Sequence, residues 1–573
     1  MSSPRGDSTW TTKVQTVSQL SIGEKGTRVV KMEAKYGLLV LTFYVAIFTG
    51  AKCDIYTSIQ KITALAEMED KLFKEFEVFL QKSDTKGEIV PDTVIRFYNE
   101  RKTDGHLDKC LDMAHPVRAF YIQHRVYNEW GAMIEDLKAN KTIALQPTVA
   151  GFLHKYKSVM TSLGFWPALG DVAGAADNIL RLWNVYDLNV KDIIDGEIAS
   201  TMSRPLKKNE IEFITGTAKN LEMVYYHLSL LSELYNRTQD EAEKENYRKR
   251  LNKEYYLIKT RTSSTLLAPT LAYTDFQRFQ AHNLVIKEAT RSSISQDDIN
   301  SFFAPPNTFM KLCRGPAKSK IVESKLRCFL RKTAIPIYMA KEEVVNYTPR
   351  ISLFHDVISN DDIRQLKKAG TKKLTHSRTG GGYVTRLRVS QTGWVYDQAI
   401  PQVSRRLARR IANIVNLDTT FRSKASPVEP WQVLSYTTGG YYGEHIDPDI
   451  GDEFLWNMTE AVQGPRALWR KHTGQRIATW MFYLSDVEAG GATVFPKLEA
   501  RVPVVKGAAA FWYNLTPSGK IDRRTQHAGC PVILGSKWVC NKWIHEVSQE
   551  FKRPCGKTVA SEDFYEDEYM PPY

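Results

Sequence analysis

The sequence of 573 residues lacks an apolar run of membrane-spanning length and is poor in cysteine, with seven in all. A helix that crosses a bilayer needs about 20 apolar residues, whereas the clearest apolar run here covers only residues 37–49. So few cysteines exclude a small scaffold held together by disulfides. With 43% hydrophobic residues, the chain is long enough for about two to four domains with ordinary cores.

Signatures of nucleic-acid binding are also missing. No block of lysine and arginine exceeds a few residues, and neither a zinc-finger nor an RNA-binding motif is present. The formal net charge of +14 admits an acidic partner, but net charge alone does not specify one. We therefore expect no nucleic-acid partner.

The apolar run at 37–49 is preceded by basic residues and followed by small ones. This arrangement is typical of a secretory signal peptide, and the alternative is a buried core helix. Met32 stands where a compact signal would begin, so residues 1–31 are interpreted as an upstream extension. Cleavage near Ala51 would deliver the chain to an oxidising compartment. No comparable run follows, so we expect no stable membrane span.

Residues 52 to about 285 have the pattern of an all-helical region. Apolar residues recur at spacings of three and four in its first segment: Ile55, Ile59, Ile62, Ala66, Phe73, Phe76 and Leu80. A polar residue, Glu69, interrupts them. The pattern predicts a helix with one apolar seam. By itself, such a seam favours a contact within the chain over an oligomer interface. Further helical patterns cover 150–186 and 209–259.

From about residue 347 the pattern changes to short β-type runs separated by glycine-rich turns. The runs are WQVLSYTTGGYY, RIATWMFYL, GGATVF, GAAAFWYNL and PVILGSKWVCNKWIH, and their spacing predicts a sandwich or barrel. Residues 286–340 are interpreted as a linker, in which Cys313 and Cys328 lie close enough in sequence for a local disulfide. Residues 556–573 are interpreted as an acidic tail.

The segment YYGEHIDPDI contains His445 and Asp447 two residues apart. If the segment is a strand, both side chains point to one face. Twelve histidines make a chance H-x-D triplet common, so a histidine at the edge of the core is the alternative. His527 supplies a second imidazole. Two imidazoles and one carboxylate form the ligand set of non-haem Fe(II) oxygenases, although Zn(II) also accepts it. Lys537, ten residues further on, suits the distal carboxylate of a 2-oxo acid.

These residues lie in segments that resemble a known family. YTTGGYYGEHID, RIATWMFYLSDVEAGGATVFP, AAAFWYNL and HAGCPVILGSKWVCNKWIHE are similar to the catalytic domain of collagen prolyl 4-hydroxylase α subunits. The resemblance implies a double-stranded β-helix (jelly-roll) catalytic domain at 341–555. It also implies a helical dimerisation domain at 52–204, which reverses the preference stated for the seam, and a tetratricopeptide-like peptide-substrate-binding domain at 205–285.

The resemblance implies a procollagen-proline 4-dioxygenase, which hydroxylates proline in X-Pro-Gly repeats while 2-oxoglutarate is decarboxylated to succinate. It implies Fe(II) at His445, Asp447 and His527, 2-oxoglutarate at Lys537, and O2 and L-ascorbate as further requirements. Three other residues are pocket candidates, although strand packing is the alternative for each: Tyr436, Thr479 and Trp538, the last for the substrate channel.

The resemblance also implies two disulfides, Cys313 with Cys328 and Cys530 with Cys555. It leaves Cys53, Cys110 and Cys540 as free thiols or intermolecular partners. The implied partners are a procollagen-like proline-rich peptide and a second α chain that dimerises through the N-terminal helices. Protein disulfide isomerase is implied as β subunit of an α2β2 tetramer, in the lumen of the endoplasmic reticulum. The substrate-binding domain would present tyrosines to a polyproline II ligand.

Several features are not explained by the resemblance. Residues 448–475 form an insertion, either a lid or an inert surface loop. Sequons that we expect at the surface are Asn140, Asn236, Asn346 and Asn457, whereas Asn514 falls in an expected buried strand. Two other functions remain open: a related oxygenase that acts on another proline-rich secreted protein, and an inactive assembly subunit with the same fold.

Overall fold

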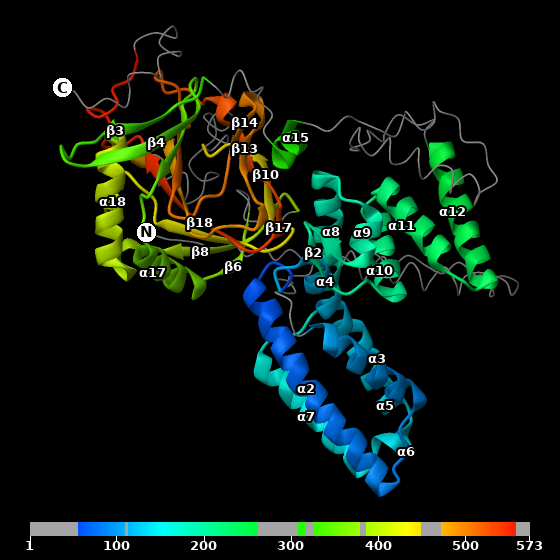
Figure 1. Ribbon diagram of the computed structural model, residues 1–573. Coiled ribbons are helices and arrows are strands. Elements are labelled where there is room, and N and C mark those ends of the chain that lie inside the picture. The colour runs from blue at the N-terminus through cyan, green and yellow to red at the C-terminus, as the bar shows by residue number, and fades with distance from the viewer. Residues whose placement is uncertain are drawn as a thin grey trace, which may run out of the picture. The chain divides into compact units, whose positions relative to one another are not determined.

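The computed structural model describes residues 55–108, 113–261, 308–315, 325–378, 386–423, 425–448 and 472–556. It contains a helical part, up to residue 261, and a β-rich part that follows (Figure 1). No helix in the described part of the chain is both long and apolar enough to cross a membrane. Several predicted features lie outside the described residues: the extension and signal peptide, Cys53, Cys110, Asn457, nearly all of the 448–475 insertion, and the acidic tail beyond residue 556.

The helical part contains one short strand pair among its helices. Its elements are α2 (Ile59–Lys86), α3 (Asp92–Asp108), α4 (Pro116–His124), the π-helical η1 (Arg125–Glu129), α5 (Trp130–Ala139), α6 (Lys141–Ala144), α7 (Pro147–Leu163), α8 (Leu169–Tyr186), α9 (Val190–Asp195), β1 (Glu197–Ile198), β2 (Thr201–Met202), α10 (Lys208–Asn220), α11 (Val224–Arg237) and α12 (Glu241–Arg261). The predicted helical stretches at 150–186 and 209–259 are therefore each divided by short breaks.

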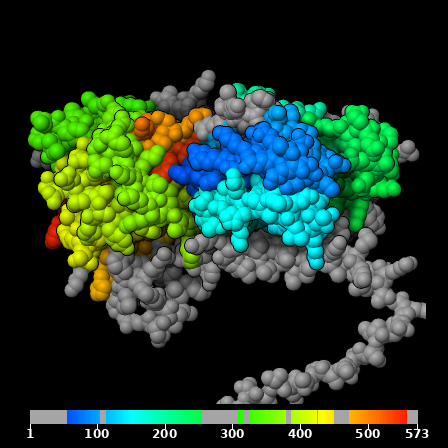
Figure 2. Space-filling view, turned by 90° about the horizontal axis from the view of Figure 1, so that it is seen from below, coloured from blue at the N-terminus to red at the C-terminus, as the bar shows by residue number. Residues whose placement is uncertain are grey.

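The seam of α2 is buried within the same chain. Helix α2 packs along α7 (Figures 1 and 2). The ring of Phe76 contacts Trp130 and Phe152, with centroids 5.6 and 5.3 Å away. The polar interruption is buried too, because Glu69 accepts a hydrogen bond of 2.6 Å from Arg125. This part of the seam therefore packs inside the chain, and its assignment to an oligomer contact is wrong. Dimerisation through other helical surfaces stays a prediction.

The tyrosines expected to face a peptide ligand in region 205–285 are mostly buried. Tyr225 and Tyr226 pack edge-on against Trp183, and Tyr247 is almost fully buried. Tyr235 is half-buried, with Arg248 over its ring. The expectation that tyrosines of this region form a binding surface is therefore wrong for Tyr225 and Tyr226, which supply the core between α8 and α11. It is also wrong for Tyr247 of α12, whose hydroxyl donates to Glu212 of α10 at 2.6 Å.

The β-rich part is built on two sheets. The nine-stranded sheet has the order β3-β4-β5-β15-β11-β18-β9-β8-β6, and the five-stranded sheet has the order β14-β13-β16-β10-β7. The strands are β3 (Cys328–Lys332), β4 (Met339–Asn346), β5 (Ile351–His355), β6 (Thr375–His376), β7 (Arg388–Val389), β8 (Gln391–Val395), β9 (Trp431–Tyr436), β10 (Tyr441–His445), β11 (Arg476–Tyr483), β12 (Ala489–Gly490), β13 (Thr493–Phe495), β14 (Ala500–Val502), β15 (Ala509–Tyr513), β16 (His527–Gly529), β17 (Val532–Leu534) and β18 (Lys537–His545). This is the jelly-roll arrangement expected for the domain.

Strand β18 of the large sheet separates a pocket face from a core face. On β18, Lys537 points between the sheets and its neighbour Trp538 points outward, because side chains alternate along a strand. The outward face is covered by α17 (Asn360–Thr371) and α18 (Pro401–Val415) (Figure 1). Strand β3 falls in the predicted linker, so the β-rich part begins before the predicted boundary at residue 341.

The structure pairs the cysteines differently from the prediction. Cys313, in α15 (Thr308–Arg314), bonds to Cys530, with 5.6 Å between their Cα atoms. Cys328, on the edge strand β3, and Cys555 are exposed free thiols, and Cys540 is a buried one. Both predicted pairings, Cys313 with Cys328 and Cys530 with Cys555, are therefore wrong. Helix α15 packs beside β13 and β14, which brings Cys313 to Cys530 across 217 residues of sequence.

Candidate active site

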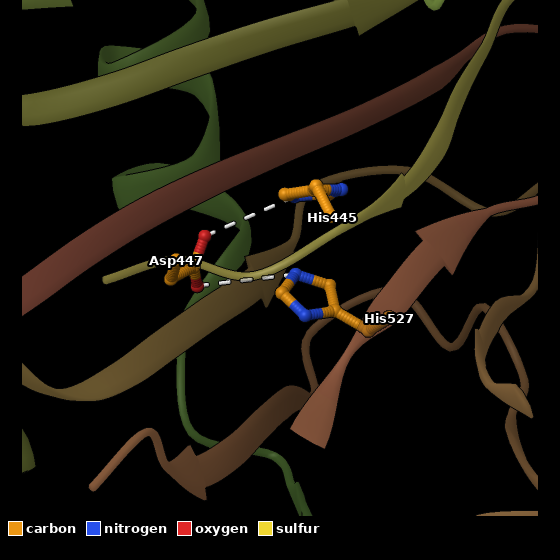
Figure 3. A group of neighbouring side chains, drawn as sticks. All are labelled: His445, Asp447 and His527. Carbon is orange, nitrogen blue, oxygen red and sulfur yellow. Dashed lines mark ion pairs between the residues drawn. The ribbon is translucent and has the colours of Figure 1, made fainter. Parts of the chain in front are cut away.

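His445, Asp447 and His527 converge between the two sheets (Figure 3). His445 ends β10, His527 begins β16, and these antiparallel strands pair the two residues directly. Asp447 lies in the bend after β10 rather than in the strand, which corrects the prediction that both residues of the triplet belong to it. Nε2 of His445 is 3.8 Å from Oδ1 of Asp447, and Nε2 of His527 is 3.9 Å from Oδ2.

Hydrogen bonds to the backbone fix which imidazole nitrogens face the centre. Nδ1 of His445 lies 2.9 Å from the carbonyl oxygen of Gly443, and Nδ1 of His527 lies 3.0 Å from that of Thr525. A carbonyl only accepts hydrogen bonds, so both Nδ1 atoms donate, and in the neutral form of each ring the lone pair is on Nε2. The two lone pairs and the carboxylate therefore suit a metal ion held by two imidazoles and one carboxylate.

The electrostatics of His445 and Asp447 favour their metal-binding forms. Burial, together with the neighbouring His527, lowers the pKa of His445 to about 3, so this imidazole is neutral at pH 7. Burial alone raises the pKa of Asp447, but His527, His445 and Arg476 bring that pKa below its ordinary value. At neutral pH the group therefore offers a carboxylate and an unprotonated His445.

Neighbouring side chains hold Asp447 in place. The hydroxyl of Thr479 donates to Oδ2 of Asp447 at 2.5 Å and accepts from Asn514 at 2.9 Å. A guanidinium nitrogen of Arg476 donates to the main-chain oxygen of Asp447 at 3.1 Å. Thr479, predicted as a pocket residue, therefore lies in the site, where it contacts the carboxylate directly. The burial of Asn514 also agrees with the expectation that its sequon is unused.

Lys537 lines the same cavity as the three converging residues. Its ammonium donates to the carbonyl oxygen of Gly491 at 2.6 Å and lies 5.7 Å from the ring centroids of Tyr436 and Tyr483. Burial lowers the pKa of Lys537 to about 7. Among the described side chains no carboxylate bonds to this ammonium, so it is placed to receive one from a bound molecule.

The cavity, of about 830 Å³, is much larger than the space around the three residues. Its lining includes residues that the sequence did not predict: Glu429, Arg476, Trp543 and His545. Arg476 lies 3.6 Å above the ring of Trp543 and pairs with Glu429 at 2.5 Å. His545 contacts Glu429 at 3.1 Å. Burial raises the pKa of Glu429, but Arg476 and His545 together bring it to about 2.

One signal in the sequence pointed to His545. It lies eight residues after Lys537, and an even separation places two residues on the same face of a strand. Arg476 carried no such signal, because a bulge between Arg476 and Ala478 interrupts the alternation on β11.

Trp538 does not line the cavity, so its assignment to a substrate channel is wrong. The ring packs in the core on the other side of the large sheet, under Lys367 of α17 at 4.7 Å. Since Lys537 points into the cavity, its neighbour on the strand has to point away from it.

A second group of possible ligands in the described residues is an ion-pair cluster. His124, Glu129 and Glu210 also bring nitrogen and oxygen atoms within 4.8 Å of one another. Arg204, however, donates to both carboxylate oxygens of Glu210, at 2.9 and 2.5 Å. The guanidinium already neutralises this carboxylate, so the group differs from the one at His445.

Comparisons with known proteins agree with both halves of the chain. Residues 58–200 match the prolyl 4-hydroxylase alpha-subunit, N-terminal region, and residues 431–545 match the 2OG-Fe(II) oxygenase superfamily. Prolyl 4-hydroxylase subunit alpha-1 of Gallus gallus is 31% identical over 546 residues, which cover 88% of this chain and 98% of that protein. The Homo sapiens alpha-1 subunit is 30% identical, over 87% of this chain and 95% of its own length.

Among solved structures, the viral collagen prolyl hydroxylase of Paramecium Bursaria Chlorella virus-1 in its 2OG complex is 27% identical. It covers 34% of this chain and 96% of its own, with a TM-score of 0.26. The sequence matches extend over most of this chain and most of the matched subunits. The chain therefore belongs to the prolyl 4-hydroxylase alpha-subunit family and is a dioxygenase of the 2OG-Fe(II) oxygenase superfamily.

Proposed function

We propose that the chain is the catalytic α subunit of a procollagen-proline 4-dioxygenase. It hydroxylates proline in X-Pro-Gly repeats and couples this step to the oxidative decarboxylation of 2-oxoglutarate to succinate and CO2. The observation that carries the proposal is the presence of the three converging residues and the buried Lys537 in one cavity. A zinc site would use the three converging residues, but Lys537 would have no role in it.

The residues have distinct roles in this reaction. Nε2 of His445, Nε2 of His527 and the carboxylate of Asp447 hold Fe(II), which supplies the redox chemistry with dioxygen when bound. Thr479 and Arg476 keep the carboxylate and its backbone in place. Lys537 would bind the distal carboxylate of 2-oxoglutarate, and because this lysine is buried, its ion pair would be shielded from water. L-ascorbate would serve as the reductant that returns oxidised iron to Fe(II).

Aromatic residues in the cavity lining suit a proline-rich peptide. Trp394 and Trp543 line the cavity with ring centroids 6.1 Å apart, and Tyr396, also in the lining, is 53% exposed. Extended proline-rich segments bind to grooves lined by aromatic rings. Arg476, against Trp543, adds a donor for peptide carbonyl groups.

The family and the predicted signal peptide support a setting in the secretory pathway. We place the protein in the lumen of the endoplasmic reticulum, with protein disulfide isomerase as β subunit of an α2β2 assembly. Exposed sequons at Asn140 and Asn236 are available for glycosylation there.

The test is a hydroxylation assay on the full chain, purified with any partner that accompanies it. With Fe(II), 2-oxoglutarate and ascorbate, (Pro-Pro-Gly) repeat peptides are expected to gain one oxygen atom per modified proline, with release of succinate. His527→Ala is expected to abolish both. Hydroxylation confined to proline-rich peptides without glycine repeats would replace collagen as the substrate class, and equal background in both proteins would indicate an inactive assembly subunit.

A further inference from the structure

Helix α8 contacts the turn that leads into the metal-ligand strand. The turn Thr437–Gly440 connects β9 to β10, and its main-chain oxygens at Thr438 and Gly439 are bonded by side chains of α8. Asn178 donates to Thr438 at 3.1 Å, and Arg181 donates to Gly439 at 2.8 Å. Six residues after Gly439 the chain reaches His445.

The side chains that make these bonds are buried and fixed by one another. Asn178 and Arg181 are 4% and 8% exposed. Arg181 also donates to the side-chain oxygen of Asn178 at 2.7 Å and to Asp177 at 2.6 Å. Its guanidinium lies 4.5 Å from the ring centroid of Tyr441, which is in β10 itself. A buried charge that is paired and fully hydrogen-bonded holds its partners in a single geometry.

The approach of α8 to this turn leaves no room for a side chain. A Cβ atom on Gly439 would lie 2.3 Å from the Cβ of Asn178, and Gly439 has φ of +72°. A glycine is therefore required here both by the backbone conformation and by the contact with the helix.

The same helix also contacts the segment that follows the other histidine ligand. Tyr186, the last residue of α8, donates to the main-chain oxygen of Pro531 at 2.6 Å. Cys530 is joined to Cys313 of α15, and Arg314 of α15 donates to the main-chain oxygen of Val185 at 2.7 Å. Cys530 lies three residues after His527. One helix therefore restrains the chain close to both histidines.

We infer that Asn178 and Arg181 of α8 are positioning residues for the metal site. They act through the turn at 437–440, so the geometry of the three ligands depends on the N-terminal helical region as well as on the jelly roll. The inference rests on the proposed function of the site, and it concerns residues that touch neither metal nor substrate. Groups that orient metal ligands from outside typically change metal affinity by about 10–100-fold when they are removed.

The test measures metal affinity rather than turnover. Metal-free full-length chain is titrated with Co(II), followed by its visible absorption, for wild type and for Arg181→Met. The variant is expected to bind Co(II) about tenfold more weakly, and backbone amides of residues 436–445 are expected to exchange hydrogen faster. Arg181→Lys keeps a donor for Gly439 and is expected to recover most of the affinity.

A matched control is Arg237→Met. Arg237 belongs to α11 and pairs with the exposed Asp195 at 2.7 Å, so its loss is expected to leave the Co(II) affinity unchanged. If Arg181→Met does not fold, Asn178→Ala, which removes a single hydrogen bond to the turn, decides the question by the same two measurements. Wild-type affinity and exchange in a folded variant would overturn the inference. If wild type and His527→Ala bind Co(II) equally, the proposed function itself fails.

Discussion

At the level of single residues, hydrogen bonds decide what each group in the cavity can bind. The two histidines of the centre are fixed by backbone carbonyls, which direct their lone pairs toward Asp447. Lys537 also bonds to a backbone carbonyl oxygen, but its protonated form carries a positive charge that this neutral oxygen does not balance. An ammonium in this setting gains most from the carboxylate of a ligand.

Replacement of Lys537 by alanine is expected to raise the KM for 2-oxoglutarate by about tenfold to hundredfold. A hydrogen bond to a charged group contributes about 1.5–3 kcal/mol, and this bond is lost together with the ion pair. The KM for the peptide is expected to change little. Lys367→Ala, on the outer side of the large sheet, is the matched control. Equal KM values for 2-oxoglutarate in wild type and Lys537→Ala would contradict the assignment.

The same lysine makes binding of 2-oxoglutarate dependent on pH. Burial lowers the pKa of Lys537 in the free protein to about 7. Below this pH the ammonium is already present. Above it, binding requires uptake of a proton, so the Kd is expected to rise by up to about tenfold per pH unit. Calorimetry on metal-loaded protein without oxygen measures this slope. Lys537→Ala should lack it, and identical slopes in both proteins would show that another group titrates.

The sequence predicted the candidate metal ligands and Lys537 better than the residues that surround them. The H-x-D triplet, His527 and Lys537 lie within about 100 residues of one another and follow a recognisable order. The network of Glu429, Arg476 and His545 was not predicted. A bulge hides which face of β11 Arg476 belongs to. Its partners come from β18 and from the segment before β9, which only the packing of the sheet brings together.

At the level of elements, the short β-type runs all became strands, because their alternation and the turns between them are local signals. Helix α18 was not predicted, although its buried residues Val403, Leu407, Ile411 and Ile414 have helical spacing. Helix α18 could therefore have been predicted from the sequence. The break between α7 and α8 could also have been predicted, because Gly164 ends α7 in the left-handed conformation and Pro167 follows it.

Strand β18 allows a direct comparison of two tryptophans on opposite faces. Trp538→Ala is expected to lower the free energy of unfolding by about 3–5 kcal/mol, because it leaves a cavity in the core beneath α17. Trp543→Ala is expected to raise the KM for the peptide several-fold, because its ring lines the active-site cavity. Denaturant unfolding and peptide kinetics, measured on both variants, check the assignment. If Trp538→Ala instead raised the KM for the peptide and Trp543→Ala lowered the free energy of unfolding, the two faces of the strand would be reversed.

At the level of the whole molecule, the disulfide is the feature least accessible from sequence. The prediction paired Cys313 with a near neighbour, whereas the structure closes a loop of 217 residues. Sequence separation says little about which cysteines meet, because packing of α15 against β13 and β14 brings them together.

Peptide mapping without reduction is expected to recover Cys313 and Cys530 in one cross-linked fragment, with Cys328 and Cys555 unpaired. A cross-link over such a long loop stabilises by on the order of 5 kcal/mol in the loop-entropy model, so Cys313→Ser is expected to lower the Tm markedly. Cys328→Ser, which removes an exposed thiol, is the control and should leave the Tm unchanged. A cross-linked fragment that joins Cys313 to Cys328 would refute the pairing.

The alternation along β18 also restricts how this strand can change in length. Lys537, Trp543 and His545 face the cavity, while Trp538 and Cys540 face the core. Inserting or deleting one residue just after Lys537 would exchange the two sets over the rest of the strand, so that tryptophan 543 would enter the core and Cys540 the cavity. A change of two residues would preserve the faces and shift only the spacing. We therefore expect variants of this strand to fold when an even number of residues is inserted or deleted, and not when the number is odd. A deletion scan of residues 537–545 can verify this.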